Sequence, residues 1–270
     1  MKKNLETDFF AAPRPRVMAH RGASGDYPEN TMPAFGAAVE IGAHYIELDV
    51  HCTRDGEVVV VHDDRLSRIA SDDRLVREVT MAELEAIDAA FNFSRDGVGF
   101  PFRGQGIRVP RLAEVLRSWS ELRFVVEFKP SDPAIADATL EVVRRTGMSG
   151  RVLFASEHLA PIARARALAP QVPTNLTATE ILAFMQALSS GARPSVATGD
   201  ALQIPPEHRG LKLATPEVVA AAHQSGLEVH VWTINEQAEM ETMLSICVDG
   251  IITDYPTRLL TLLHSRQQRD

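Results

Sequence analysis

Short apolar runs alternate along the chain with longer stretches in which apolar residues recur at helical spacing. The short runs end at polar or turn-forming residues, which is typical of buried strands. We expect strands at Arg16–Ala19, Tyr45–Val50, Glu57–Val61, Arg123–Phe128, Arg151–Ala155, Val172–Asn175, Ala201–Ile204, Glu228–Val231 and Gly250–Ile252. The longer stretches predict helices, several of which follow a residue suited to an N-cap. We expect helices at Thr31–Ile41 (after Asn30), Met81–Ala89 (after Thr80), Ala134–Thr146, Glu180–Leu188, Pro216–Gln224 (after Thr215) and Glu236–Ile246 (after Asn235).

This alternation of strand and helix is typical of a parallel sheet with helical crossovers. The number of units predicts a closed (β/α)8 barrel of the TIM type, whose active sites lie at the carboxyl ends of the strands. An open, doubly wound sheet is the alternative. It would need a glycine-rich phosphate loop after the first strand, and Gly22-Ala23-Ser24-Gly25 does not have the GxGxxG pattern.

One connection is too short to hold a helix. Only a few residues separate Val50 from Glu57, and Asp55-Gly56 is a turn signal. A parallel crossover needs about a dozen residues or more. We therefore predict that the strand pair within 45–61 lacks a crossover helix and forms a hairpin, with its second strand additional to the eight of the barrel. Such pairing would bring His62 level with Asp49 or its neighbours.

The chain is expected to form one catalytic barrel domain, residues 16–270, after a mobile lead-in of residues 1–15. A length of 270 residues is ordinary for an α/β barrel. Residues 63–122 form one long connection, which contains a polar run and a segment rich in Gly, Phe and Pro. Because long loops after barrel strands lie over the active-site face, we expect this connection to act as a small cap that shapes substrate access.

Composition and charge exclude several classes of protein. The net charge of −8 argues against a nucleic-acid-binding protein, which usually presents a basic face. Two cysteines, Cys52 and Cys247, are too few for a disulfide framework, and we interpret both as buried or half-buried thiols. No apolar signal-peptide core follows Lys2 and Lys3, and no run of eighteen apolar residues occurs. We expect a cytoplasmic protein without stable membrane insertion.

Three carboxylates stand at the ends of two expected strands. Glu47 and Asp49 occupy alternate positions of one strand and therefore share a face, and Glu127 ends the next barrel strand. Oxygen ligands without accompanying cysteine suit one hard divalent cation, Mg²⁺ or Ca²⁺. The alternative is that Lys129 neutralises Glu127 and no metal binds.

Two of the nine histidines, His20 and His62, each follow an apolar strand, where barrel active sites are built. Histidine can give and take protons near neutral pH, so this pair predicts acid–base catalysis. Asp63 and Glu29 are candidate partners that would orient the rings. His51 shares a face with Asp49 and could lie near the metal. The remaining histidines are interpreted as structural: His44, His158, His208, His223, His230 and His264.

Two cations and their neighbours complete the candidate site. Arg21 presents a planar fork of donors suited to phosphate oxygens, and Lys129 shares a face with Glu127. Glu29 could pair with Arg21 and orient it. Asn30 could hydrogen-bond near the site, although its helix-capping position alone would explain it.

The residues described above belong to short motifs whose order along the chain resembles that of the glycerophosphodiester phosphodiesterase family. Segments that match the family run from about residue 16 to about residue 260. The motifs are Ala19-His20-Arg21-Gly22, Pro28-Glu29-Asn30-Thr31, Glu47-Leu48-Asp49, His62-Asp63, Glu127-Phe128-Lys129, Trp232-Thr233-Ile234-Asn235 and Asp249-Gly250-Ile251-Ile252-Thr253-Asp254. Two positions depart from the family: Ser156-Glu157 stands where Ser-Phe is usual, and Cys247 where glycine is usual.

The resemblance implies metal-dependent hydrolysis of small-molecule glycerophosphodiesters to sn-glycerol 3-phosphate and an alcohol. His20 and His62 would transfer protons, Trp232 would form an apolar wall beside the glycerol, and the long connection would contact the leaving alcohol. Asp254 follows the last expected strand, and it could cap a helix that begins at Pro256 rather than act on the substrate. Two other functions stay open: lysophospholipase D or sphingomyelinase-D-like action on lipid phosphodiesters, with the stretch Glu180–Leu188 in contact with lipid, and a non-catalytic barrel that binds phosphorylated ligands.

Overall fold

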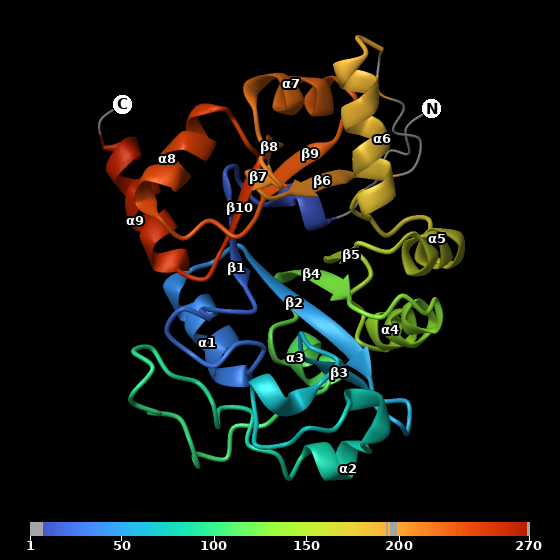
Figure 1. The fold of residues 1–270 in the computed structure, drawn as a ribbon, viewed down its shortest axis with the longest axis vertical. Coiled ribbons are helices and arrows are strands. Elements are labelled where there is room, and N and C mark those ends of the chain that lie inside the picture. Colours follow the sequence, from blue (N-terminus) through green and yellow to red (C-terminus); the bar gives the residue numbers. More distant parts are fainter. Residues whose placement is uncertain (1–7, 193, 195–198, 269–270) are drawn as a thin grey trace.

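The computed structural model describes residues 8–192, 194 and 199–268, and its centre is a parallel barrel. Seven strands pair in the order β5-β4-β2-β1-β10-β9-β6 (Figure 1). Their bounds are β1 Arg16–His20, β2 Tyr45–Cys52, β4 Arg123–Phe128, β5 Val152–Ala155, β6 Ala201–Ile204, β9 Glu228–Val231 and β10 Gly250–Thr253. All neighbouring pairs along this path are parallel. The expected barrel is therefore confirmed, and the open sheet is not found.

The eighth strand position of the barrel is filled by a short extended segment between β5 and β6. Thr174 forms a parallel bridge to Phe154, and Asn175 forms one to Ala201. The segment lies where a strand was expected at Val172–Asn175, but only these two isolated bridges form. Pro173 contributes to the difference because proline has no amide hydrogen for the ladder, although its carbonyl accepts from Phe154.

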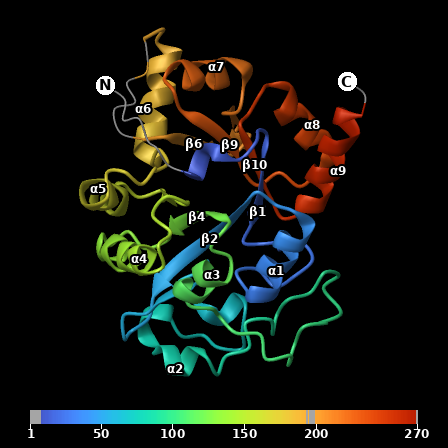
Figure 2. The same cartoon turned by 180° about the vertical axis from the view of Figure 1, so that it is seen from behind.

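Helices surround the strands, as the front and back views show (Figure 1 and Figure 2). They are α1 Met32–Ile41, α3 Leu112–Ser118, α4 Ala134–Arg145, α5 Leu159–Leu168, α6 Ala178–Ser189, α7 Pro216–Gln224, α8 Gln237–Ser245 and α9 Pro256–Gln267. Each expected helix is found, with shifts of one or two residues at most ends. The sequence did not indicate α5, whose buried residues are only Pro161, Ile162 and Ala165. So few apolar contacts give no clear helical period.

The predicted hairpin is confirmed, since β3 (Val58–Val60) pairs antiparallel with the end of β2 and no helix separates them. The amide of Val61 donates to the carbonyl of Asp49 at 3.0 Å, which places His62 beside the carboxylates of β2. The long connection then leaves the barrel and returns next to β3, where the amide of Val60 donates to the carbonyl of Pro110. Helix α3, also not indicated by the sequence, carries the chain from there to β4.

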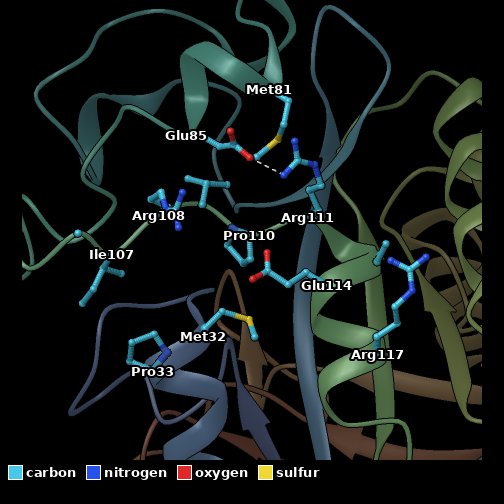
Figure 3. Close-up of a pocket in the computed structure, with 13 residues that line it drawn as sticks. Met32, Pro33, Met81, Glu85, Ile107, Arg108, Pro110, Arg111, Glu114 and Arg117 are labelled. Atoms are coloured by element: carbon cyan, nitrogen blue, oxygen red, sulfur yellow. Dashed lines mark hydrogen bonds and ion pairs between the residues drawn. The ribbon is translucent and has the colours of Figure 1, made fainter.

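Before α3, the long connection contains only short helices, which are η2 Leu66–Arg68, η3 Val76–Glu78 and α2 Met81–Leu84. The expected helix Met81–Ala89 ends early, and the amide of Ala89 instead donates to the carbonyl of Ile107. A small core of its own, which includes Val59, Leu66 and Leu84, holds the excursion together. A cavity of about 520 Å³ lies between it, α1 and α3 (Figure 3). None of the expected catalytic or metal-binding residues lines this cavity.

The mobility expected of the lead-in, residues 1–15, stays a prediction, but its described part contacts the barrel. Asp8–Ala11 forms a 3₁₀ helix (η1), and the side chain of Phe9 is fully buried. The Tyr45 hydroxyl donates to the Phe9 carbonyl, and Arg16 Nη2 donates to the Phe10 carbonyl at 2.7 Å. This segment therefore packs on the amino end of the barrel, opposite the predicted site. Residues 1–7 lie outside the described part of the chain.

A second small hairpin follows β6 and was not expected from the sequence. Its strands are β7 (Glu207–His208) and β8 (Leu211–Lys212), which pair antiparallel. Arg209 and Gly210 form the two-residue turn, both with positive φ, as hairpin turns of this length require. The hairpin rises from the carboxyl end of the barrel, beside the site described next.

Candidate active site

Three carboxylates meet at the carboxyl ends of β2 and β4. Asp49 is level with Glu127 in the parallel register, and Glu47 lies two residues before Asp49 on the same face. One oxygen of each of the three side chains lies within 4.8 Å of the others. The structure therefore brings together the three residues that the sequence predicted as metal ligands.

The electrostatics of this trio fit a bound cation. Burial and the charge of Asp49 raise the pKa of Glu47 to about 8, and the same two causes raise the pKa of Glu127. Burial opposes the ionisation of Asp49 as well, but Arg21 and Lys129 lower its pKa. Asp49 Oδ1 is buried and, among the described residues, has no hydrogen-bond partner. Crowded, buried oxygen ligands with an unsatisfied acceptor match the preferences of Mg²⁺ or Ca²⁺.

Two cationic side chains flank the trio. Lys129 Nζ lies 3.0 Å from Glu127 Oε1 and 3.4 Å from Asp49 Oδ1. Arg21 Nη1 donates to Glu29 Oε1 at 2.9 Å, and Arg21 Nε lies 3.2 Å from Asp49 Oδ2. The expected Arg21–Glu29 pair is therefore present. The Lys129–Glu127 pair, which was the alternative to a metal, is present as well, beside the three carboxylates.

The turn after β1 sets the position of Arg21. Arg21 has a φ of 57° and Gly22 a φ of 87°, both in the left-handed region. A Cβ at Gly22 would lie 2.6 Å from the carbonyl carbon of Ala34, so this position requires glycine. The turn also directs the backbone amide of Arg21 toward Glu47, with Oε2 at 3.1 Å.

Asn30 has a different role from the one its position suggested. The N-cap of α1 is Thr31, and Asn30 itself has a left-handed φ of 56°. The Asn30 side chain instead donates through Nδ2 to Asp49 Oδ2 at 2.8 Å. Asn30 thus fixes one oxygen of a candidate metal ligand, which confirms that it hydrogen-bonds at the site and corrects the capping interpretation.

Each of the two histidines has a carboxylate partner at Nδ1. His62 Nδ1 lies 2.6 Å from Asp63 Oδ1, as expected. His20 Nδ1 lies 2.6 Å from Asp254 Oδ1, so its partner is not Glu29. Asp254 does not cap α9, whose N-cap is Tyr255; it is held by Ser24 Oγ and Asn235 Nδ2. These pairs leave both Nε2 atoms available for proton transfer.

The two rings differ in their tendency to hold a proton. Burial lowers the pKa of His62, and the charges of Arg21 and Lys129 act in the same direction. Burial also disfavours the charged form of His20, but the hydrogen bond to Asp254 and the charge of Glu47 raise its pKa overall. The two histidines are therefore biased toward opposite protonation states.

The site opens into a cavity of about 680 Å³. One end is polar and is lined by His20, Arg21, Glu47, His62, Glu127 and Lys129. The other walls are largely apolar and come from β6, α6, the β7–β8 hairpin and Trp232. Trp232 is 37% exposed and lines the cavity, as expected for a wall residue. Within the described chain, no residue of 63–122 lines this cavity, and a role of the long connection as a cap that shapes substrate access stays a prediction.

Comparison with known proteins agrees with this geometry. The model of the glycerophosphoryl diester phosphodiesterase family matches residues 20–258. The chain belongs to this family. The glycerophosphodiester phosphodiesterase of Bacillus altitudinis is 31% identical over 258 residues, covering 92% of this chain and 97% of the relative. That of Caldanaerobacter subterraneus subsp. tengcongensis is 30% identical over 263 residues, covering 92% and 97%.

A solved structure of a phosphodiesterase has the same fold. The phosphodiesterase of Oleispira antarctica, in complex with the product sn-glycerol-3-phosphate, superposes with a TM-score of 0.76 at 26% identity, covering 93% of this chain and 97% of that one. The family resemblance stated from the motifs is thus confirmed. Among the helices of the described chain, none combines the length and the apolar character that a bilayer crossing requires.

Two residues at the site were not identified as part of it from the sequence: Asp254 pairs with His20, and Arg68 binds both Asp63 and Glu29. His51, which the sequence placed on the face of Asp49, has its Nε2 3.0 Å from the His62 carbonyl. His51 therefore contacts the backbone of a histidine at the site. Only Asp254 had a usable signal, because it follows the last barrel strand directly.

Proposed function

We propose that the protein hydrolyses glycerophosphodiesters to sn-glycerol 3-phosphate and an alcohol, using one divalent cation, Mg²⁺ or Ca²⁺. The observation that carries this proposal is the polar end of the cavity. There, two histidines that pair with carboxylates, the cationic side chains of Arg21 and Lys129, and the three carboxylates lie together. This set supplies proton donors and acceptors together with positive charge for a phosphate diester. Family membership and the product bound to the Oleispira antarctica relative support the substrate class.

The carboxylates and the cationic side chains have separate tasks in this proposal. Glu47, Asp49 and Glu127 would hold the cation, which when bound supplies positive charge that polarises the phosphate group. Arg21 and Lys129 bind non-bridging phosphate oxygens and offset the charge that develops on them. Glu29 and Asn30 keep Arg21 and Asp49 in place through the hydrogen bonds described above.

The different environments of the two histidines support different roles for them. His62, whose pKa is lowered by burial, is neutral at physiological pH and accepts a proton from the nucleophile at Nε2. His20, whose protonated ring is stabilised by the hydrogen bond to Asp254, donates its Nε2 proton to the oxygen of the leaving alcohol. The nucleophile is water, or it is the hydroxyl of the substrate's own glycerol, which forms a cyclic phosphate that water then opens to glycerol 3-phosphate.

A coupled assay of glycerol 3-phosphate release tests the proposal. Glycerophosphocholine, glycerophosphoethanolamine and glycerophosphoglycerol are each tested with Mg²⁺, with Ca²⁺ and with EDTA. We expect release from at least one substrate that EDTA abolishes and one of the two cations restores. A protein that binds glycerol phosphates but releases no product from any substrate would support the non-catalytic alternative. The cytoplasmic location stays a prediction, to be checked by cell fractionation.

The apolar part of the cavity favours lysophospholipids as a second candidate substrate. Ile181, Leu182 and Met185 on α6 face the cavity, whereas Phe184 of the same helix lies in the core. Leu182 and Leu211 are each 58% exposed. An acyl chain esterified to the glycerol could cover these side chains while the phosphate stays at the polar end. Choline release from lysophosphatidylcholine, lowered selectively by Leu182→Ser, would support this activity, and release unaffected by Leu182→Ser would remove the argument.

A further inference from the structure

Arg68 lies just outside the cavity and joins the two halves of the candidate site. It ends η2, which is anchored by the fully buried side chain of Leu66. Its Nη1 and Nη2 atoms donate to Glu29 Oε2 and Oε1, each at 2.7 Å. Its Nε donates to Asp63 Oδ2. One guanidinium thus uses three donors to hold two carboxylates.

Each of these carboxylates has a second partner inside the site. Asp63 accepts with its other oxygen, Oδ1, from His62 Nδ1 at 2.6 Å. Glu29 accepts from Arg21 Nη1 at 2.9 Å. Arg68 does not line the cavity, so a role in binding the substrate directly is not indicated. The chain of contacts therefore runs from Arg68 through a carboxylate to each active-site group.

We propose that Arg68 is a positioning residue that orients the His62 ring and the Arg21 guanidinium together, through Asp63 and Glu29. The inference rests on the proposed phosphodiester hydrolysis, in which these two groups act on the substrate. A planar guanidinium can bind one carboxylate with both terminal nitrogens while its Nε binds another, and this fixes the relative placement of the two acids. A lysine has a single nitrogen and cannot reproduce that geometry.

Asp63 and Glu29 need a residue that holds them in place because both side chains are partly exposed. The side chains of Asp63 and Glu29 are 30% and 22% exposed, so water can compete for their oxygens. Without Arg68, Asp63 could rotate its carboxylate away from His62 Nδ1, and the ring would lose its fixed orientation. Loss of an orienting partner typically lowers activity about 10–100-fold.

The test compares Arg68→Ala with Arg74→Ala. Arg74 lies in the same long connection, its side chain is equally exposed (45%), and it pairs with Asp72 and Glu83. Neither acid contacts a residue of the site. We expect Arg68→Ala to lower kcat/KM about 10–100-fold, Arg68→Lys to recover little of it, and Arg74→Ala to leave it unchanged, with similar Tm values for both alanine variants. Added guanidinium should partly restore Arg68→Ala.

A second comparison separates positioning from a direct or purely structural role. In a background that carries Asp63→Asn and Glu29→Gln, removal of Arg68 should change kcat/KM less than about threefold, because the groups through which it acts are already disabled. If Arg68→Ala costs as much there as in the wild type, Arg68 acts by another route and the proposal is wrong. Full activity of Arg68→Ala in the wild-type background would also overturn it.

Histidine NMR of the protein without substrate provides a readout that does not depend on activity. We expect an exchange-protected Nδ1 proton for His62, identified by its absence in His62→Ala. The signal should weaken or vanish in Arg68→Ala and persist in Arg74→Ala. Persistence in Arg68→Ala would contradict the positioning role. If the wild type releases no product but the variants show the expected NMR differences, the proposed substrate would be refuted and the positioning role of Arg68 supported.

Discussion

Asp49 on β2 and Glu127 on β4 are direct partners in the parallel register of these strands. This one-to-one pairing converts two motifs that are far apart in the sequence into one cluster, since the carboxyl ends of parallel strands meet at the same edge. Glu47 joins them because it shares a face with Asp49. The trio is thus a consequence of strand register, and its ligand function can be tested one residue at a time.

Glu127→Gln should weaken the binding of Mg²⁺ or Ca²⁺ by roughly one to two orders of magnitude, because affinity for these ions depends on the number of charged oxygen ligands. Isothermal titration calorimetry measures the change. Glu121→Gln is the control, since Glu121 is 88% exposed at the opposite end of β4 and pairs with Arg151. Cation affinity that is equal in the two variants would show that Glu127 is not a ligand.

His20→Ala and His62→Ala should each lower kcat roughly 10²–10⁴-fold without loss of fold, because a positioned acid or base is removed. The double variant should be little worse than the worse single variant, since both groups serve one proton-transfer event. Circular dichroism and cation titration serve as controls. A single variant that keeps most of its activity would show that its histidine is not part of the pair.

The pH profile should reflect the lowered pKa of His62. As a base it must be neutral, so kcat/KM at saturating cation should increase as pH rises through a midpoint below the ordinary value of 6.5. His62→Ala should lose this acidic limb. A midpoint clearly above 6.5 that persists in His62→Ala would assign the limb to another group.

Asp254→Asn should lower kcat about 10–100-fold, because the amide no longer holds the charged, correctly oriented ring of His20. Asp249→Asn is its counterpart at the other end of the last strand, where Asp249 Oδ2 accepts from Val229 N at 2.8 Å. That variant should lower Tm and leave kcat near wild type. The prediction fails if the two substitutions affect kcat alike.

Gly22→Ala should destabilise the protein more than Gly42→Ala. Both positions have a similar positive φ, which costs a side chain about 1–2 kcal/mol. A Cβ at Gly42 meets nothing within 4 Å, whereas one at Gly22 collides with the backbone of Ala34. We expect a further 1–3 kcal/mol for Gly22→Ala, roughly the cost of overpacking, as measured by urea unfolding. Equal losses would mean that the turn relaxes freely.

The two thiols should react at very different rates with a disulfide reagent. Burial raises the pKa of Cys52 to about 11, so little thiolate is present at pH 8, whereas Cys247 is exposed. The sequence interpretation of Cys247 as a buried or half-buried thiol is thus wrong. We expect one fast equivalent in the native protein, lost in Cys247→Ser, and a second only on unfolding. Two fast equivalents would contradict the burial of Cys52.

Much of the barrel and the polar end of the site follow from local sequence. Strand period and length identify the staves, and residues at strand ends gather at one edge of a parallel barrel whatever the details of packing. The hairpin follows from chain length alone, because the segment between Val50 and Glu57 cannot hold a crossover helix. Its antiparallel pairing was predicted correctly for this reason.

Other features depend on tertiary structure that no local pattern encodes. His20 meets Asp254 only because barrel closure makes β1 and β10 neighbours, as their register shows. Arg68 lies in a segment without periodicity, so its contacts with Glu29 and Asp63 depend on how the long connection folds back. The apolar wall of the cavity likewise depends on the placement of α6 and of the β7–β8 hairpin, which carries only two residues per strand.

The contact between His20 and Asp254 has a consequence for synthesis of the protein. Its two members are separated by 234 positions in the chain. A ribosome-bound chain that has emerged only as far as β9 already contains both histidines and the whole carboxylate trio, yet His20 has no orienting acid. Strand β10, which lies beside β1 in the folded barrel, is missing at that stage. The contact between His20 and Asp254 can therefore form only after β10 has been synthesised and has joined β1.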